Sequence, residues 1–154
     1  MARFISAVTF SLVTATATVA SAGPLEDRFL AAQEAFEQNL NAFYVSRVPA
    51  LEGKIPSFTA DPAARDAMLC GFSYLREETG VAGALKLIVF LESAAEEPIT
   101  SFDDITQAPD GAVAETMLSA VRACNTIEIS QQLMAESGAL EIFSDPATLD
   151  ALMD

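Results

Sequence analysis

The 154-residue sequence contains no histidine and no tryptophan, and it has only two cysteines and two tyrosines. The missing histidine excludes Ser-His-Asp and Cys-His catalysis in their usual forms, and it removes the commonest ligand of transition metals. The motifs G-x-G-x-x-G, G-x-x-x-x-G-K-[ST] and G-x-S-x-G, which serve dinucleotide, phosphate and hydrolase chemistry, are also absent. We therefore expect no cofactor and no bound metal, and a non-catalytic function is favoured over an enzyme.

Basic residues are also scarce, with eight Lys and Arg against 22 Asp and Glu. All the acidic residues follow Gly23, so the chain from Gly23 onward carries seven basic side chains and a net charge of −15. Such a surface repels nucleic acid phosphates and anionic lipid headgroups, so neither nucleic acid nor a membrane surface is an expected partner. The charge either serves solubility alone or attracts basic partners and cations.

The first 22 residues are typical of a secretory signal peptide. Arg3 precedes an uncharged stretch over residues 4–19, and Ala20-Ser21-Ala22 fits the rule of small residues before a cleavage site. The stretch is short and rich in Ser and Thr for a membrane span, which takes about 20 mainly apolar residues; a retained anchor is the alternative interpretation. We expect a signal peptide over residues 1–22, a helical domain over residues 23–154, and a periplasmic or secreted protein without membrane attachment after cleavage.

Cys70 and Cys124 are the only cysteines, and in an exported protein such a pair predicts a disulfide. Closing a loop of this length contributes on the order of 4 kcal/mol in the chain-entropy model. A redox-active pair is the alternative, but the sequence shows neither C-x-x-C nor a setting that stabilises a thiolate.

Apolar periodicity, proline and glycine predict an all-α, single-domain bundle of about five helices closed by one disulfide. The predicted helices cover residues 24–48, 62–79, 81–97 and 112–137 (with a kink at Asn125-Thr126), with short ones near residues 101–107 and from Asp145-Pro146 onward. Asp61-Pro62 is a strong helix start, and Gly80 and Gly138 are predicted stops. Residues 81–91 are apolar on nearly every face, which predicts a central helix, although residues 86–91 alone also fit a buried strand.

Phe29, Phe36 and Phe43 recur every seven residues in the first predicted helix. This spacing places them near one face, with Glu26, Asp27, Glu34 and Glu37 on other faces. The stripe is either part of the core or a surface that binds a partner; the core interpretation is favoured.

The acidic residues leave two weak candidates for chemistry. Glu92-Ser93 resembles the Glu-Ser of lytic transglycosylases, but the partner motif of those enzymes is missing, and glycan cleavage would have to rely on carboxylates alone. Asp103, Asp104 and Asp110-Gly111, followed by Glu115, suggest a calcium loop, but Thr106 and Ala108 stand where an EF-hand needs an acidic residue or Asn.

The layout resembles the HdeA-type acid-stress chaperones, which are exported and helical with one disulfide. The resembling stretch runs from Cys70-Gly-Phe-Ser-Tyr-Leu to Ala120-Val-Arg-Ala-Cys124. The Phe-rich first helix and the longer spacing between the cysteines depart from that family, and no family is identified from the resemblance.

Two functional hypotheses follow. The first is a small, acidic, exported interaction module, that is, an adaptor, an inhibitor or a chaperone-like protein with an unspecified protein partner and oligomeric state. In its sharpest form, protonation of the carboxylates at low pH loosens the packing and exposes apolar side chains to client proteins. The alternative is a carboxylate-only enzyme acting on the cell wall or another glycan, with Glu92 as its candidate.

Overall fold

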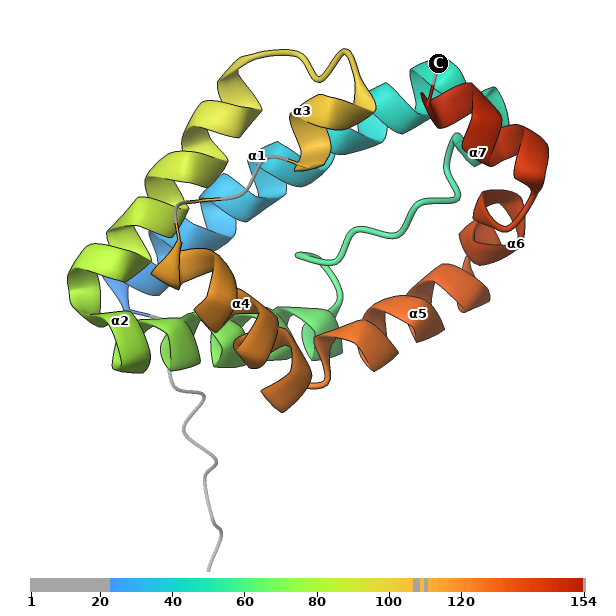
Figure 1. Cartoon of the computed structure of the whole chain (residues 1–154). Coiled ribbons are helices and arrows are strands. Elements are labelled where there is room, and N and C mark those ends of the chain that lie inside the picture. The colour runs from blue at the N-terminus through green and yellow to red at the C-terminus, as the bar shows by residue number, and fades with distance from the viewer. Residues whose placement is uncertain (1–22, 107–108, 110, 154) are drawn as a thin grey trace, which may run out of the picture.

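The structure is a computed structural model that describes residues 23–106, 109 and 111–153. The predicted signal peptide over residues 1–22 lies outside the described residues. The described part is all-α, as predicted, with seven α-helices and one 3₁₀ helix (Figure 1). The helices are α1 (Pro24–Arg47), η1 (Pro49–Leu51), α2 (Pro62–Glu96), α3 (Phe102–Thr106), α4 (Ala112–Ala123), α5 (Thr126–Glu136), α6 (Ala139–Phe143) and α7 (Pro146–Met153).

The long helix α1 begins and ends where the sequence predicts. Pro24 occupies the first turn, where the missing N–H is not needed, and Glu26 and Asp27 place negative charge at the positive end of the helix dipole. Pro49 follows Val48, whose backbone is no longer helical, and the chain continues as η1.

Helix α2 consists of two arms that meet at Gly80, and we call residues 62–79 the first arm and residues 81–96 the second arm. Asp61 caps the first arm by accepting a hydrogen bond of 2.9 Å from the Ala64 N–H. Gly80 has φ 71° and ψ −179°, a backbone conformation that is essentially restricted to glycine. The predicted stop is therefore a bend, and the second arm turns away from the first to run up the left of Figure 1.

The second half of the chain is divided into more helices than the sequence predicted. The expected helix over residues 112–137 is broken into α4 and α5 at Asn125, which has a left-handed backbone with φ 53°. Gly138 ends α5, also with a positive φ, and the short helix α6 that follows was not predicted. Helix α7 begins at Asp145-Pro146 as expected, with Asp145 accepting a hydrogen bond from the Ala147 N–H.

The prediction that residues 81–91 form a central helix, covered on all sides, is wrong. They form most of the second arm, which buries Leu87, Ile88 and Leu91 but leaves Val81 and Val89 more than half exposed. An apolar sequence on every face does not require burial on every face, because exposed single apolar residues are common in soluble proteins.

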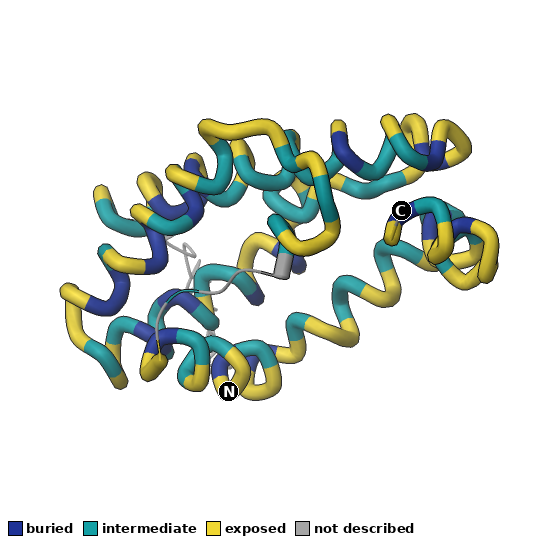
Figure 2. Tube along the Cα trace, turned by 45° about the horizontal axis from the view of Figure 1, so that its top comes forward, coloured by how far each residue is buried: buried dark blue, intermediate teal, exposed yellow. Residues whose placement is uncertain are grey.

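The buried residues form two separate clusters. The first core joins the N-terminal part of α1 to both arms of α2 and to α4, and its buried members are Phe29, Leu30, Ala32, Phe72, Leu75, Ala84, Leu87, Ile88, Leu91 and Val113. The second core joins the C-terminal part of α1 to η1, α6 and α7, and its buried members are Phe43, Val48, Leu51, Ala139 and Leu152. Helix α1 thus spans both cores, whereas α5 has no buried residue and appears only in teal and yellow in Figure 2.

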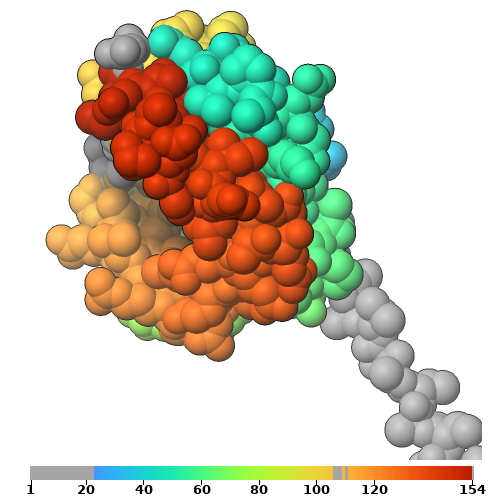
Figure 3. Space-filling view, turned by 90° about the vertical axis from the view of Figure 1, so that its right-hand side faces the viewer, coloured from blue at the N-terminus to red at the C-terminus, as the bar shows by residue number. Residues whose placement is uncertain are grey.

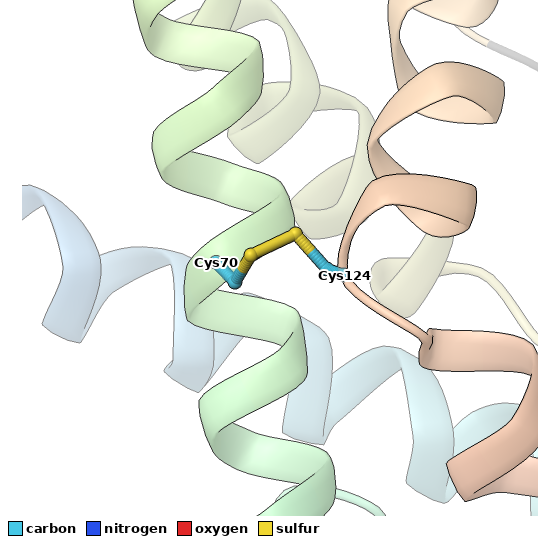
Figure 4. Close-up of a disulfide and its surroundings, with 2 residues drawn as sticks. All are labelled: Cys70 and Cys124. Carbon is cyan, nitrogen blue, oxygen red and sulfur yellow. A yellow bond between two sulfur atoms is a disulfide. The ribbon is translucent and has the colours of Figure 1, made fainter.

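The predicted disulfide is confirmed. Cys70 of the first arm is bonded to Cys124 at the end of α4, with a Cα–Cα distance of 5.9 Å (Figure 4). The two helices approach closely beside the disulfide. Gly71 of the first arm faces Ala120 of α4, and a Cβ at position 71 would lie 3.8 Å from the Cβ of Ala120. The covalent bond therefore fixes α4 to the first arm within the first core.

Within the described residues, no helix combines the length and the apolar character needed to cross a membrane.

Candidate functional site

A cavity of about 740 Å³ lies between the two cores. Phe29, Leu75 and Leu87 of the first core line one side, and Tyr44 and Phe143, which pack against the second core, line the other. Ligand pockets in proteins typically measure about 300–1,000 Å³ and are mostly apolar, so both the size and the lining fit a site for a small molecule.

Helix α1 supplies one continuous wall of the cavity. The lining residues recur at steps of three and four along the helix, which places them on one face. They are Phe29, Gln33, Phe36, Glu37, Leu40, Asn41 and Tyr44, with Glu34 and Gln38 at the edge.

Small side chains on the first arm of α2 leave the space open. Ala64, Ala67 and Gly71 line the cavity at a spacing of three and four residues, and both alanines are buried, at 4% exposure each. Larger side chains at this face would occupy the cavity volume. Met68 and Leu75 line it from the same arm.

The wall opposite α1 is formed by α5 and its neighbours. Thr126, Ile129, Ser130 and Met134 line the cavity from one face of α5, together with Met117 and Val121 of α4. Because this face borders a cavity rather than a packed core, these four residues of α5 are half-buried and not fully buried. The side view in Figure 3 shows the surface hollowed beside α5, between the α4 and α6 segments.

Several polar residues interrupt the apolar lining, and two of them, Glu37 and Asn41, lie one helical turn apart on α1. Glu37 Oε2 accepts hydrogen bonds from the Thr59 backbone N–H at 3.3 Å and from the Thr59 hydroxyl at 3.2 Å. Glu37 Oε1 and Asn41 Oδ1 are shielded from solvent and have no hydrogen-bond partner in the protein. Burial raises the pKa of Glu37 above its usual value, and the hydrogen bonds from Thr59 offset part of that increase.

Tyr44 lies at the side of the second core. Its ring packs edge-on against Phe143, with ring centroids 5.2 Å apart, and burial raises the pKa of its hydroxyl. Both aromatic side chains line the cavity, so they connect the packing of the second core to the site.

The structure places the three phenylalanines of the predicted stripe in different environments. Phe29 is buried in the first core and stacks on Phe72, with ring centroids 4.4 Å apart. Phe43 is buried in the second core, where the Arg47 guanidinium lies 5.6 Å from its ring centroid. Phe36 is half-buried and lines the cavity with Phe29. The three residues therefore do not form one exposed surface in this structure.

Glu92 lies on the outside of the molecule and does not line the cavity. Arg28 of α1 donates two hydrogen bonds to its carboxylate, at 2.8 and 2.7 Å. These bonds lower the pKa of Glu92, which disfavours a role as a general acid near neutral pH. A second ion pair, between Glu26 and Arg76, joins α1 to the first arm of α2.

Of the acidic residues considered for a cation site, Asp104 has a structural role at the start of α3. Its Oδ2 accepts hydrogen bonds from the backbone N–H groups of Thr100 and Ser101 and from the Thr100 hydroxyl. These bonds lower the pKa of Asp104, and the bond from the Ser101 N–H is the one that the acidic residue accepts in a capping box, here with Asp in place of Glu. Asp110 lies outside the described residues, and no group of three or more potential ligands gathers within them.

Sequence reasoning missed the polar end of the cavity. Glu37 was expected on a different face of α1 from the phenylalanines, but it lines the cavity beside Phe36 and its carboxylate is half-buried against Thr59. The periodicity of Phe36 and Leu40 indicates an apolar face, and Glu37 and Asn41 lie next to it. The sequence does not indicate where residues 55–58 lie in the fold. In the structure they line the cavity together with Glu37 and Asn41.

Comparison with known proteins supplies no relative: no family model, no curated protein and no solved structure matches this chain significantly.

Proposed function

We propose that the chain is an exported, non-catalytic binding protein whose cavity holds a small apolar molecule. The observation that carries the proposal is the cavity of about 740 Å³ between the two cores, whose lining is mainly apolar and includes four Phe, four Leu and three Met side chains. Methionine suits such a site because its flexible thioether adapts to differently shaped ligands. Export is supported by the disulfide, which persists mainly in oxidising compartments.

The carboxylate-only enzyme has weaker support. Glycoside hydrolysis needs one carboxyl group with a raised pKa and a second one nearby. Glu92 has a lowered pKa and is paired with Arg28, so it offers neither a proton donor nor a free nucleophile. Among the cavity residues the half-buried carboxyl group is that of Glu37, and it is held by hydrogen bonds from Thr59.

The chaperone-like form of the interaction module requires acid to loosen the fold. The ion pairs Glu26–Arg76 and Arg28–Glu92 both join α1 to α2, and the pKa values of both glutamates are lowered. Protonation of these groups would weaken the contact between the two longest helices. The two ion pairs therefore favour acid sensitivity as a second property of the protein, and the dependence of stability on pH tests it.

Fluorescence of N-phenyl-1-naphthylamine, a neutral apolar probe, tests the binding function. Ala67→Leu places three further carbon atoms at the cavity wall, and Ala63→Leu makes the same change at an exposed position one turn earlier on the same helix. We expect Ala67→Leu to weaken probe binding by at least about tenfold, which is about 1.4 kcal/mol, and Ala63→Leu to leave it unchanged. Absence of probe binding, or equal binding by both variants, would contradict the proposal.

The stability of Ala67→Leu supplies an independent check on the cavity. Adding methylene groups to a packed core typically costs about 1–3 kcal/mol. Because the cavity can accommodate the larger side chain, we expect the thermal midpoint of Ala67→Leu to equal or exceed that of the natural protein. A midpoint several degrees lower would indicate that Ala67 lies in a fully packed region.

A further inference from the structure

The cavity is elongated along α1. Its lining residues on that helix run from Phe29 to Tyr44, and at a rise of 1.5 Å per residue this wall is about 22 Å long. A sphere with the volume of the cavity, about 740 Å³, would measure only about 11 Å across. The shape therefore suits a long, narrow molecule better than a compact one.

The lining offers no partner for a charged group inside the cavity. No Lys or Arg is among the lining residues within the described part of the chain, so an anion would be buried without a cation. A cation fares no better at Glu37, because Oε1 is shielded from solvent and Oε2 is occupied by hydrogen bonds from Thr59. Glu34 borders the cavity but is exposed, and exposed ion pairs contribute little.

Two hydroxyl groups of α5 offer a place for an uncharged polar group. Thr126 and Ser130 lie one turn apart, both line the cavity, and both are half-buried. Within the described residues neither hydroxyl has a hydrogen-bond partner, and neither oxygen is shielded from solvent as Glu37 Oε1 is. A hydroxyl both donates and accepts hydrogen bonds, so this pair can bind an alcohol without any charge.

From the shape, the missing charges and the two hydroxyls we infer that the cavity binds an uncharged, single-chain amphiphile: a linear alkyl chain ending in a neutral group such as an alcohol. The chain lies along α1, and the polar group contacts Thr126 and Ser130. The inference rests on the proposed binding function and adds to it the shape and the charge of the ligand.

Displacement of N-phenyl-1-naphthylamine by a matched ten-carbon series tests the charge. The competitors are 1-decanol, decanoate and decylamine, each kept below the concentration at which it aggregates, with the purified, disulfide-bonded protein near pH 7. An ionic strength of about 0.15 M screens charges more than about 8 Å apart, which reduces the general attraction of cations to an acidic protein. We expect 1-decanol to bind at least about tenfold more tightly than either charged competitor.

The length of the chain tests the shape. From 1-octanol through 1-decanol to 1-dodecanol, each further methylene group should tighten binding by about fourfold, because each is buried against the apolar lining. If the affinity stops rising at 1-octanol, the site is compact and the inferred shape is wrong.

A double variant tests the two hydroxyls. Thr126→Val with Ser130→Ala should weaken 1-decanol by at least about fivefold, which corresponds to one neutral hydrogen bond, and leave the probe bound. Ser119→Ala is the control: this hydroxyl donates to the Glu115 carbonyl on α4 and lies outside the cavity, so 1-decanol should bind as before. Equal affinity of the double variant and the control for 1-decanol would contradict the role of the α5 hydroxyls.

The outcomes distinguish this inference from the proposed function. If the probe binds and the three ten-carbon competitors displace it equally, or if decanoate or decylamine binds most tightly, the ligand class is wrong and the apolar site remains. If the probe does not bind at all, the binding function itself fails.

Discussion

The first and second cores of the molecule are held together by different means. Within the described residues, the disulfide and the two ion pairs all join elements of the first core, and that core is built on the longest helices. The second core combines one end of α1 with η1, α6 and α7, which have between three and eight residues each. Its additional contacts are weaker, such as the hydrogen bond from Arg47 to the Thr100 carbonyl at 2.9 Å.

This difference gives the cavity two unequal sides. Short helices have little stability of their own and depend on packing, and local opening begins where buried apolar contacts are few. We therefore expect the first core to act as the fixed wall of the site. The second core, with Tyr44 and Phe143 at the cavity, should be the side that opens to admit a ligand.

The largest expected effect concerns the disulfide of the first core. Replacing Cys70 and Cys124 together by Ser should lower the free energy of unfolding by about 2–5 kcal/mol, because the unfolded chain is no longer constrained. Urea denaturation of the variant and of the natural protein, with and without reductant, measures this loss. Equal stability of the two proteins under oxidising conditions would contradict a stabilising role for the bond.

Two matched leucines compare the cores directly. Leu75 in the first core and Leu51 in the second are each at most 1% exposed, and Leu→Ala at such sites costs about 2–5 kcal/mol. We expect Leu75→Ala to lower the stability of the whole molecule. Leu51→Ala should instead remove hydrogen-exchange protection mainly from α6 and α7, while amides of α2 and α4 keep theirs. Uniform loss of protection in both variants would show that the two cores unfold as one unit.

Gly80 tests how the first core is assembled. Its backbone conformation is essentially restricted to glycine, so Gly80→Ala should cost about 1–3 kcal/mol even though a Cβ there meets no neighbouring atom within 4 Å. Gly71→Ala, at a helical position of the first arm where a Cβ would lie in ordinary van der Waals contact with Ala120 at 3.8 Å, is the control and should cause no such loss. Thermal unfolding that shows no loss for Gly80→Ala would contradict the restricted bend between the two arms.

The pH dependence of stability should differ in sign between the first core and the cavity. Glu26 and Glu92 have lowered pKa values, so their contribution is present above the usual glutamate pKa of 4.5 and is lost as the pH falls through the lowered folded values. Glu92→Gln should therefore make the acid-induced loss of stability smaller than in the natural protein. Urea titrations at a series of pH values measure this, and Glu78→Gln is the control for removal of one charge.

Glu37 should act in the opposite direction. Because its pKa is raised in the folded protein, its negative charge lowers stability at neutral pH, and that cost disappears as the pH falls through the raised value. Glu37→Gln should stabilise the protein modestly near pH 7 and have no effect at a pH low enough to protonate Glu37. A variant that is equally stabilised at both pH values would show that the charge of Glu37 is not the cause.

The sequence was sufficient to predict most of the helices, though not α6, because their start and stop signals act locally. Asp61-Pro62 and Asp145-Pro146 begin helices as predicted, and Gly80, the predicted stop, interrupts α2 as a bend. The two cysteines were enough to predict the disulfide because no other pairing exists. The cavity could not be predicted in the same way. It depends on how far α5 lies from α1, and periodicity gives which face of a helix is apolar but not whether that face is packed or borders a cavity.

The methionine methyl groups provide the most direct test that the space between the cores is a ligand site. Met68, Met117 and Met134 line the cavity, whereas Met153 is 74% exposed and serves as an internal control. In protein labelled with ¹³C at the methionine methyls, titration with N-phenyl-1-naphthylamine should shift the resonances of the three lining residues and leave that of Met153 unchanged. Shifts confined to Met153, or no shifts while the probe is bound, would contradict binding between the cores.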